Sequence, residues 1–487
     1  IKPLFYSLLP DGQFIFGSEL KVLKCHPDLP TKMNPQAVED YFALGYIPEP
    51  KTIYQDVYKL DPGHTLTIKQ GQSELRSNEY WDIPFTPVSY SSEQELEEEL
   101  IHRLREAVDI RMVSEVPLGA FLSGGVDSSA VVAMMAGLQK EPVNTCSIGF
   151  DVKGYDESLY AQKVAEQFGT DHYMRTVAPD DFDLVDELAG LYDEPYADSS
   201  ALPTYRVCQL AKKRVTVALS GDGGDEHFAG YRRYCWHMNE EKLRSALPLG
   251  IRKPLFGTLG NLYPKADWAP RVFRAKTTFQ ALARSSVDAY LHGVSLTSAE
   301  QRNALFSDSM KSELQGYRVN EVFDRHAKHS PTDDPLGLIQ YIDMKTYLVG
   351  DILTKVDRAS MAHSLEVRVP LLDHEFVEWV SGIPSNVKLK GQEGKYILKS
   401  ALEKHLSNDI LYRKKMGFSI PIAKWFRGPL KEKLRATIIN GSLAETGLFN
   451  QNYLTRLFDQ HQSGQRDHSA ALWACLMFDL SLKNLSL

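Results

Sequence analysis

A short run of glycines, serines and one aspartate has the composition of a phosphate-binding loop. Residues 123–129 are Ser-Gly-Gly-Val-Asp-Ser-Ser, and they stand between an apolar, strand-like run at 116–122 and an apolar, helix-like run at 130–136. Two glycines let backbone N–H groups approach an anion, Ser128 and Ser129 add hydroxyl donors, and a helix N-terminus favours negative charge. The pattern therefore predicts a phosphate site where a strand turns into a helix.

Asp127 would repel a bare phosphate, so its place in this loop calls for a cation. A divalent ion such as Mg2+ can bridge a carboxylate and phosphate oxygens. An ordinary strand-to-helix turn is the alternative for a lone Ser-Gly-Gly, but the full string argues against it. The string is similar to the pyrophosphate-binding loop of the ATP pyrophosphatases, which cleave ATP to AMP and pyrophosphate.

A second cluster of glycines and acids, Ser-Gly-Asp-Gly-Gly-Asp-Glu, occupies residues 220–226 and follows a strand-like run at 215–219. In open parallel sheets, ligands bind beyond the carboxyl ends of the strands. Because both clusters follow strands of one expected sheet, we expect them to line one crevice. Neighbouring carboxylates raise one another's pKa unless a cation lies among them. A flexible acidic surface loop is the alternative.

The elements that must position these clusters alternate along the chain. Strand-like runs at 116–122, 145–150, 172–177 and 215–219 are separated by helical stretches. This alternation predicts an α/β fold, a doubly wound parallel sheet with helices on both faces. The chain then becomes helical, and the run at 469–482 predicts a buried core helix.

Residues 1–85 have a different pattern. Short alternating runs at 4–8 and 13–16, joined by Pro10-Asp11-Gly12, predict a β-hairpin. The segment 84–92, with two prolines and several hydroxyl residues, predicts a linker before an acidic amphipathic helix at 93–110. We therefore divide the chain into residues 1–85, a linker at 86–95 and residues 96–487.

Composition narrows the function classes. The chain has 487 residues, 43% of them hydrophobic and 24% charged, which fits a globular protein of roughly two to four domains. A formal net charge of -8 argues against a general nucleic-acid or membrane-surface role. Five cysteines without Cys-x-x-Cys spacing indicate reduced thiols and no structural zinc site. Because no apolar run reaches the ~18 residues of a membrane span, we expect a cytoplasmic protein.

Two further stretches carry charge. In residues 353–373, charged and apolar residues are interleaved, which predicts paired, partly buried charges that hold a helix and loop against the site. His363 is expected to be structural rather than catalytic. Residues 391–395, Gly-Gln-Glu-Gly-Lys, are too short for a P-loop, and no strand is expected before them. We still expect residues 391–395 to form a glycine loop that carries Lys395 toward phosphate.

With these motifs combined, the chain resembles the bacterial glutamine-dependent asparagine synthetases over essentially its whole length. The strings Leu-Ser-Gly-Gly-Val-Asp-Ser-Ser, Ser-Gly-Asp-Gly-Gly-Asp-Glu and Gly-Lys-Tyr-Ile-Leu-Lys occur in family order. The resemblance implies an N-terminal-nucleophile glutaminase domain that releases ammonia. It also implies a C-terminal domain of ATP-pyrophosphatase type, which activates the aspartate side chain as an acyl-adenylate that ammonia attacks, giving asparagine, AMP and diphosphate.

The resemblance also implies roles for residues at matching positions. Asp127 and Asp225 would hold Mg2+, Lys395 would neutralise the departing pyrophosphate, and Asp222, which is often Glu in the family, would serve the incoming nitrogen. The amino-acid substrate should lie at a loop that contains Asp198, Ser199 and Ser200. The positions that match the ATP site are Leu122, Ser123, Gly124, Gly125, Asp127, Ser128, Ser129, Ile148, Ser220 and Gly221.

The front of the chain departs from the family. Ile1 matches a late glutaminase strand, and Cys25 does not correspond to the N-terminal nucleophile. We therefore expect residues 1–85 to be the β-rich remnant of a glutaminase domain, and this chain as written not to hydrolyse glutamine, unlike a longer parent. Glu19 and residues 46–62 are expected in the remnant and its interface with the rest.

Other interpretations remain open, because the loop at 198–203 differs from the enteric pattern. One is a related amidotransferase or β-lactam synthetase-like enzyme that acts on another carboxylate, for instance in surface-polysaccharide biosynthesis. A non-catalytic ATP-sensing scaffold belongs to a different class, and intact Asp127, Asp225 and Lys395 argue against it. The expected partners are ATP, aspartate, and ammonia or glutamine, and a homodimer is left open.

Overall fold

The centre of the molecule is a parallel β-sheet. The computed structural model describes residues 2–69, 71, 75–150, 157–177, 184–263, 275–413 and 420–485. Within these residues the central sheet has five strands in the order β10-β9-β6-β7-β8, and all neighbours run parallel. The strands are β6 (Leu118–Phe121), β7 (Asn144–Phe150), β8 (Asp171–Val177), β9 (Val217–Leu219) and β10 (Glu366–Arg368). The predicted α/β fold with a parallel sheet is confirmed, and β10 is an edge strand that the sequence did not predict.

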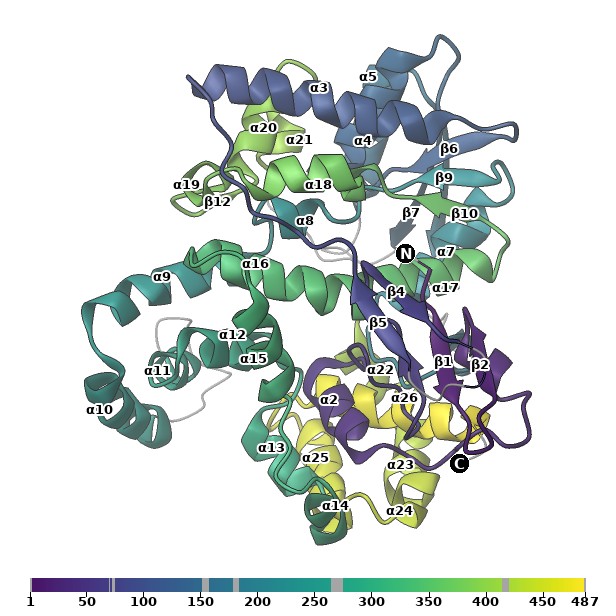
Figure 1. Ribbon diagram of the computed structural model, residues 1–487, viewed down its shortest axis with the longest axis vertical. Coiled ribbons are helices and arrows are strands. Elements are labelled where there is room, and N and C mark those ends of the chain that lie inside the picture. The colour runs from purple at the N-terminus through teal and green to yellow at the C-terminus, as the bar shows by residue number, and fades with distance from the viewer. Residues whose placement is uncertain are drawn as a thin grey trace.

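Helices cover both faces of this sheet, because side chains along a strand alternate between faces. Ala120 and Leu122 belong to a core that includes residues of α3 (Glu93–Met112), α4 (Val126–Leu138) and α5 (Ser158–Phe168). Cys146 and Ile148 belong to the opposite core, with residues of α6 (Leu184–Leu191), α7 (Ala201–Ala211) and α17 (Thr354–Met361). In Figure 1, α3 lies above the strands and α7 and α17 lie below them.

The N-terminal part is built from short strands and helices, and it packs against the C-terminal helices. The strands β1 and β2 pair as the predicted antiparallel hairpin, and β4 and β5 form a second one. The Tyr41 hydroxyl donates to the carbonyl of Ala474 at 2.9 Å, so the purple and yellow ends of the chain in Figure 1 share a core. The elements are β1 (Phe5–Leu8), β2 (Phe14–Gly17), α1 (Leu20–Leu23), α2 (Pro35–Leu44), β3 (Tyr58–Lys59), β4 (His64–Thr67) and β5 (Arg76–Glu79).

The remaining chain is mostly helical. Between β9 and β10 lie α8 (Gly224–His227), α9 (Arg232–Ala246), α10 (Leu249–Leu262), α11 (Lys276–Leu282), α12 (Ser286–Val294), α13 (Ala299–Leu305), α14 (Asp308–Glu313), α15 (Asn320–His329), α16 (Pro335–Lys345), a π-helical segment η3 (Leu348–Leu353) and α17. In Figure 1, α9 to α12 form an arm at the left. After β10 come η4 (Pro370–Leu372), α18 (His374–Ser381), α19 (Ser385–Lys388), β11 (Leu389–Lys390), β12 (Glu393–Gly394), α20 (Tyr396–Leu402), α21 (Asn408–Leu411), α22 (Ile422–Arg427), α23 (Lys431–Asn440), α24 (Ser442–Glu445), α25 (Gln451–Gln462) and α26 (Ser469–Leu485).

Several sequence predictions can be compared with these elements. The predicted buried helix near the C-terminus is α26, whose Leu472, Cys475 and Leu476 are fully buried. The expectation that no strand precedes the loop at 391–395 was wrong, because β11 pairs with β12 across it. None of the described helices combines the length and the apolar character that crossing a bilayer requires. All five cysteines are described and free, and Cys25 alone among them is exposed.

Buried ion pairs join the N-terminal part to the sheet domain. Arg358 on α17 lies 3.2 Å from Asp193 and 3.5 Å from Glu19. Lys59 lies 2.6 Å from Glu194, and Glu194 belongs to the loop that leads to α7. The prediction that the charges at 353–373 are paired and partly buried is therefore confirmed for Arg358, and Glu19 does contact the rest of the chain.

Candidate active site

A cavity of about 850 Å³ opens beyond the carboxyl ends of β6, β7 and β9. Both glycine-acid clusters line it, so the prediction that they share one crevice is confirmed. The residues that match the family's ATP site and line the cavity are Leu122, Ser123, Gly125, Asp127, Ser128, Ile148, Ser220 and Gly221.

The loop from Ser123 to Ser129 folds around the N-terminus of α4. Gly125 is the N-cap residue and provides no side-chain cap, and the first-turn residues Val126, Asp127 and Ser128 line the cavity. The Ser123 and Ser128 hydroxyls lie 3.0 Å apart, and the Ser128 hydroxyl accepts from the Ser123 N–H at 3.2 Å. Gly124 has a φ of +70°, and a Cβ there would lie 2.5 Å from the Ala161 nitrogen. These backbone donors and hydroxyls are the groups that hold phosphate oxygens.

The second cluster packs directly on the first, and glycines make this possible. A Cβ on Gly221 would lie 2.7 Å from the Ser128 nitrogen, and one on Gly224 would lie 2.3 Å from Asp127 Oδ1. Real Cβ atoms do not approach so closely. The glycines therefore bring the acids of the second cluster beside the phosphate loop.

Lys395 connects the two clusters. Its buried ammonium pairs with Asp127 and lies 2.8 Å from Asp225 Oδ1. Burial lowers the pKa of Lys395 and the two carboxylates raise it, with the net pKa above the usual value, so the group stays charged. Its backbone has a φ of +59°, unusual for a residue other than glycine. The loop at 391–395 thus carries the lysine into the cavity.

The donor set around Lys395 fits a magnesium ion shared with a ligand. Asp127 and Asp225 offer carboxylate oxygens, the ligands that Mg2+ prefers, and a single ammonium does not balance their two charges. Among the described residues, no group of three or more His, Cys, Asp or Glu side chains is arranged to hold a metal by itself. A Mg2+ ion that also binds phosphate needs only one or two carboxylates.

Two more acids of the second cluster line the cavity. Burial raises the pKa of Asp222. The Ser220 hydroxyl, which donates to Asp222 Oδ2 at 2.5 Å, lowers this pKa, but the net pKa stays above the usual value. Burial and the nearby Asp225 raise the pKa of Glu226 to about 7, and the Tyr231 hydroxyl donates to its carboxylate at 2.8 Å. Asp222 is thus a more basic carboxylate than a free aspartate and suits proton transfer.

The loop before α7 forms another wall of the cavity. Asp198 and Ser200 line it together with Lys355 of α17. The Lys355 ammonium lies 2.7 Å from Asp198 Oδ2 and 2.7 Å from the Ser200 hydroxyl. Burial alone would raise the pKa of Asp198, but the Lys355 ammonium holds it below the usual value.

Some expected site residues do not line the cavity. Gly124 packs against Tyr160 and Ala161, Ser129 is fully buried within α4, and Ser199 is half-buried outside the cavity wall. Sequence reasoning missed Lys355, because it assigned the charges at 353–373 to structural pairing. The sequence places Lys355 four residues before Ala359 on one helix. This spacing does not by itself show whether that face of the helix meets a core or a cavity.

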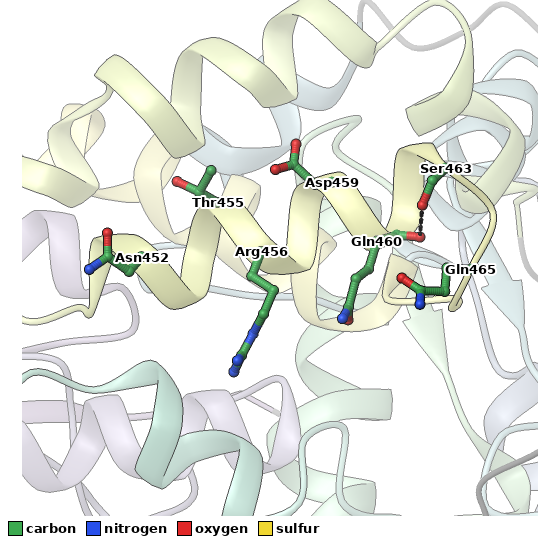
Figure 2. Close-up of a pocket in the computed structure, with 7 residues that line it drawn as sticks. All are labelled: Asn452, Thr455, Arg456, Asp459, Gln460, Ser463 and Gln465. Atoms are coloured by element: carbon green, nitrogen blue, oxygen red, sulfur yellow. Dashed lines mark hydrogen bonds between the residues drawn. The ribbon is translucent and has the colours of Figure 1, made fainter.

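A separate shallow hollow of about 450 Å³ lies on α25. Figure 2 shows that its residues come from this one helix and the turn after it, and that Arg456 and Asp459 point in opposite directions. The Ser463 hydroxyl donates to the Gln460 carbonyl at 3.2 Å. Because its polar groups do not converge, the hollow is not a candidate active site.

Comparisons with known proteins agree with this geometry. Residues 99–483 match the model of the asparagine synthase family, and residues 1–81 match the glutamine amidotransferase domain. Asparagine synthetase (glutamine-hydrolyzing) 1 of Bacillus subtilis is 31% identical over 484 residues, covering 98% of this chain and 73% of that protein. A putative asparagine synthetase (glutamine-hydrolyzing) of Mycobacterium bovis is 33% identical over 502 residues, covering 99% of this chain and 72% of that protein. Amidase chyE of Penicillium rubens is 26% identical over 496 residues, covering 93% of this chain and 71% of that protein.

Proposed function

This chain belongs to the asparagine synthase family, and from that premise we propose that its cavity joins ammonia to the side-chain carboxylate of aspartate with ATP, giving asparagine, AMP and pyrophosphate. One observation carries the proposal. A phosphate loop, a buried lysine between two aspartates and a polar wall with Asp198 and Lys355 line a single cavity.

In the first step, a carboxylate oxygen of aspartate attacks the α-phosphorus of ATP, and pyrophosphate leaves. Carboxylate is a poor acyl donor, whereas AMP leaves the activated acid far more easily than oxide would. Ser123 and Ser128, with the N-terminus of α4, bind the phosphates, and Lys395 neutralises the charge that grows on pyrophosphate. When bound, Mg2+ would supply further positive charge at phosphate oxygens. Asp127 and Asp225 are the residues that would hold it.

In the second step, ammonia attacks the acyl carbon, the bond to AMP breaks, and the new nitrogen must lose a proton. Asp222 is the base that we assign to this proton. Its raised pKa brings its basicity nearer to that required at neutral pH. A site closed to water would protect the acyl-adenylate from hydrolysis.

We assign these steps to residues 96–487, an ATP-pyrophosphatase-type domain, and residues 1–85 to part of the glutaminase domain that supplies ammonia, with a linker at 86–95. The matches at 99–483 and 1–81 support this division. A cytoplasmic location rests on the five free thiols.

The test is aspartate-dependent exchange of labelled pyrophosphate into ATP with Mg2+, followed by AMP and asparagine formation with ammonia. Exchange that needs aspartate and is lost in Asp127→Ala, but kept in a surface control such as Asp308→Ala, supports the proposal. If the protein binds ATP but forms AMP only with a different carboxylate, the acceptor assignment is wrong and the enzyme is an amidotransferase of another substrate. If no carboxylic acid gives exchange, the ligase proposal is wrong.

A further inference from the structure

We propose that Lys355 and Asp198 form the receptor for the amino-acid head of the acceptor, with Lys355 binding its α-carboxylate and Asp198 its α-ammonium. This inference rests on the proposed function. It adds to that function a specificity-determining residue, Lys355, which recognises the part of the substrate that does not react.

The first observation is the position of Lys355. The residue is 7% exposed, yet it lines the cavity. An ammonium group has three N–H donors. In the part of the chain that the structure describes, its hydrogen bonds run to Asp198 and Ser200, which leaves one donor for a ligand. A carboxylate in the cavity is the natural acceptor for it.

The Asp198 carboxylate is also held in place by hydrogen bonds. Its Oδ1 accepts from the Ser200 N–H at 2.9 Å, and its Oδ2 accepts from Lys355 at 2.7 Å and from the Ser200 hydroxyl at 2.5 Å. A carboxylate can accept about four hydrogen bonds. Asp198 therefore keeps capacity for one more donor, and its partners fix its orientation before the substrate arrives, which lowers the entropy lost on binding.

The second observation is that Lys355 is separate from Lys395 among the five described Lys and Arg side chains that line the cavity. Lys395 pairs with Asp127 and Asp225 at the phosphate loop. Lys355 instead pairs with Asp198, and it feels the charges of Asp351 and Asp222. Lys395 serves the departing pyrophosphate, so it does not also hold the acceptor. Lys355 lies at the other wall with Asp198 and Ser200, where the carboxylate of the acceptor that does not react can lie.

The charges at this wall match an α-amino-acid head. Lys355 and Asp198 neutralise each other, so the pair presents a positive and a negative group side by side without net charge. An α-ammonium and an α-carboxylate present the same arrangement with opposite sign. In a water-poor wall such a matched pair of charges is bound more strongly than in bulk water.

Substrate analogues test this contact directly. β-Alanine is aspartate without its α-carboxylate, and succinate is aspartate without its α-amino group. With the wild-type protein, we expect kcat/KM for AMP formation with ammonia to be roughly 10- to 100-fold lower for each analogue than for aspartate. This is the range for a hydrogen bond to a charged group. Lys355→Gln should lower kcat/KM for aspartate by a similar factor, mainly through KM.

The decisive quantity is the coupling between enzyme and substrate changes. Because Lys355→Gln has already lost the contact, its rates with aspartate and β-alanine should differ only a few-fold, while its discrimination against succinate remains. Asp198→Asn should show the reverse pattern. A purely structural role for Lys355 would lower the rates with aspartate and β-alanine by the same factor.

The chain offers a matched control. Lys51 also contacts a buried carboxylate, Asp40 at 2.8 Å, and a hydroxyl, Tyr317 at 2.6 Å, but it does not line the cavity. Lys51→Gln should leave the discrimination against β-alanine unchanged. Thermal melting and Mg-ATP binding without acceptor show whether each variant is folded. Ser200→Ala, which keeps both charges, should raise KM for aspartate several-fold with kcat little changed.

The outcomes separate the two proposals. If the wild-type protein forms no AMP with aspartate, the proposed function is wrong and the receptor falls with it. If it uses β-alanine as well as aspartate, or if Lys355→Gln loses the same factor with both, the receptor is overturned while the ligase stands. If Lys355→Gln does not fold, the wild-type analogue series and Ser200→Ala decide in the same way.

Discussion

At the scale of single residues, Lys395 is the side chain on which the candidate site depends most. It is buried between Asp127 and Asp225, and its backbone has a φ of +59°. Such a conformation is unfavourable for a residue with a side chain and persists only where the surroundings hold it. Here its N–H donates to the Phe228 carbonyl at 2.7 Å. The strain is compatible with a role in which position matters more than stability.

Replacing Lys395 with Met should abolish most of the exchange activity. The two aspartates would then lack their cation, and no ammonium would stabilise charge on pyrophosphate, so we expect a loss of at least about 100-fold in aspartate-dependent exchange. Lys390→Met, at an exposed position five residues earlier, is the matched control. Activity of Lys395→Met within tenfold of the wild-type value would show that the lysine has no part in the chemistry.

Asp351 should make stability depend on pH. Burial and the charge of Asp198 raise its pKa to about 7, well above the usual value. Between about pH 4 and 7 the folded protein keeps this proton while the unfolded chain has lost it, so the contribution to stability falls as pH rises and levels off above 7. Asp351→Asn cannot ionise. Its free energy of unfolding relative to wild type should therefore rise by on the order of 2 kcal/mol between pH 5 and 8.

Denaturant unfolding at several pH values measures this difference. Asp308→Asn, which removes a charge from a fully exposed site, controls for the change in net charge. A difference between Asp351→Asn and wild type that does not change with pH would mean that Asp351 is ionised in the folded protein throughout.

At the scale of elements, the site depends on loops that approach one another more closely than side chains allow. Gly230, which follows α8, is the clearest case. A Cβ there would lie 2.0 Å from Asp225 Oδ1 and 2.1 Å from Lys395 Cε. The short α8 thus brings its own end against the lysine loop, and the two carboxylates and the ammonium are set by backbone packing.

Gly230→Ala should therefore lower exchange activity by at least about tenfold, because the methyl group must displace Asp225 or Lys395 from its position, and small misplacements are costly in active sites. The control is Gly293→Ala, within α12, where a Cβ meets nothing within 4 Å. It should keep full activity and stabilise the protein by up to about 1 kcal/mol, the helix preference of Ala over Gly. Equal activity of the two variants would contradict this account.

The elements that carry the site could be predicted because their sequence signals are local. The strand before Ser123, the helix after it and the glycines of both clusters follow from composition and order alone. β10 was missed because a strand of three residues, Glu366–Arg368, has too short a pattern to be recognised among charged neighbours. Lys355 was interpreted as structural because a charge on a helix has the same sequence signal whether it faces a core pair or a cavity. Tertiary placement alone distinguishes the two.

At the scale of the whole molecule, the N-terminal part supports the substrate wall. Lys59, in β3, lies 2.6 Å from Glu194, which also accepts from the Ile53 N–H at 2.7 Å. Glu194 stands only four residues before Asp198. The loop that presents Asp198 to the cavity is therefore anchored from the other part of the chain.

Breaking this anchor should affect both stability and substrate binding. Glu194→Gln leaves the buried Lys59 ammonium without its charge partner, which costs about 3–5 kcal/mol in comparable cases. We also expect KM for aspartate to rise while the affinity for ATP changes little. Replacing both residues, Lys59→Met with Glu194→Met, should recover much of the lost stability. Urea unfolding and exchange kinetics measure the two effects, and a stability loss without any change in KM would separate the anchor from the site.

The free cysteines give this molecule a built-in chemical reporter. Cys25 is exposed in the N-terminal part, whereas Cys146 and Cys235 are buried at the cavity wall. Burial raises the pKa of the Cys146 thiol to about 11, and only the thiolate reacts with alkylating reagents. Cys25 therefore accepts a fluorophore quickly and without mutagenesis. Slow alkylation of Cys146 and Cys235 at the cavity wall measures how often the site opens, and a bound nucleotide should lower this alkylation rate further.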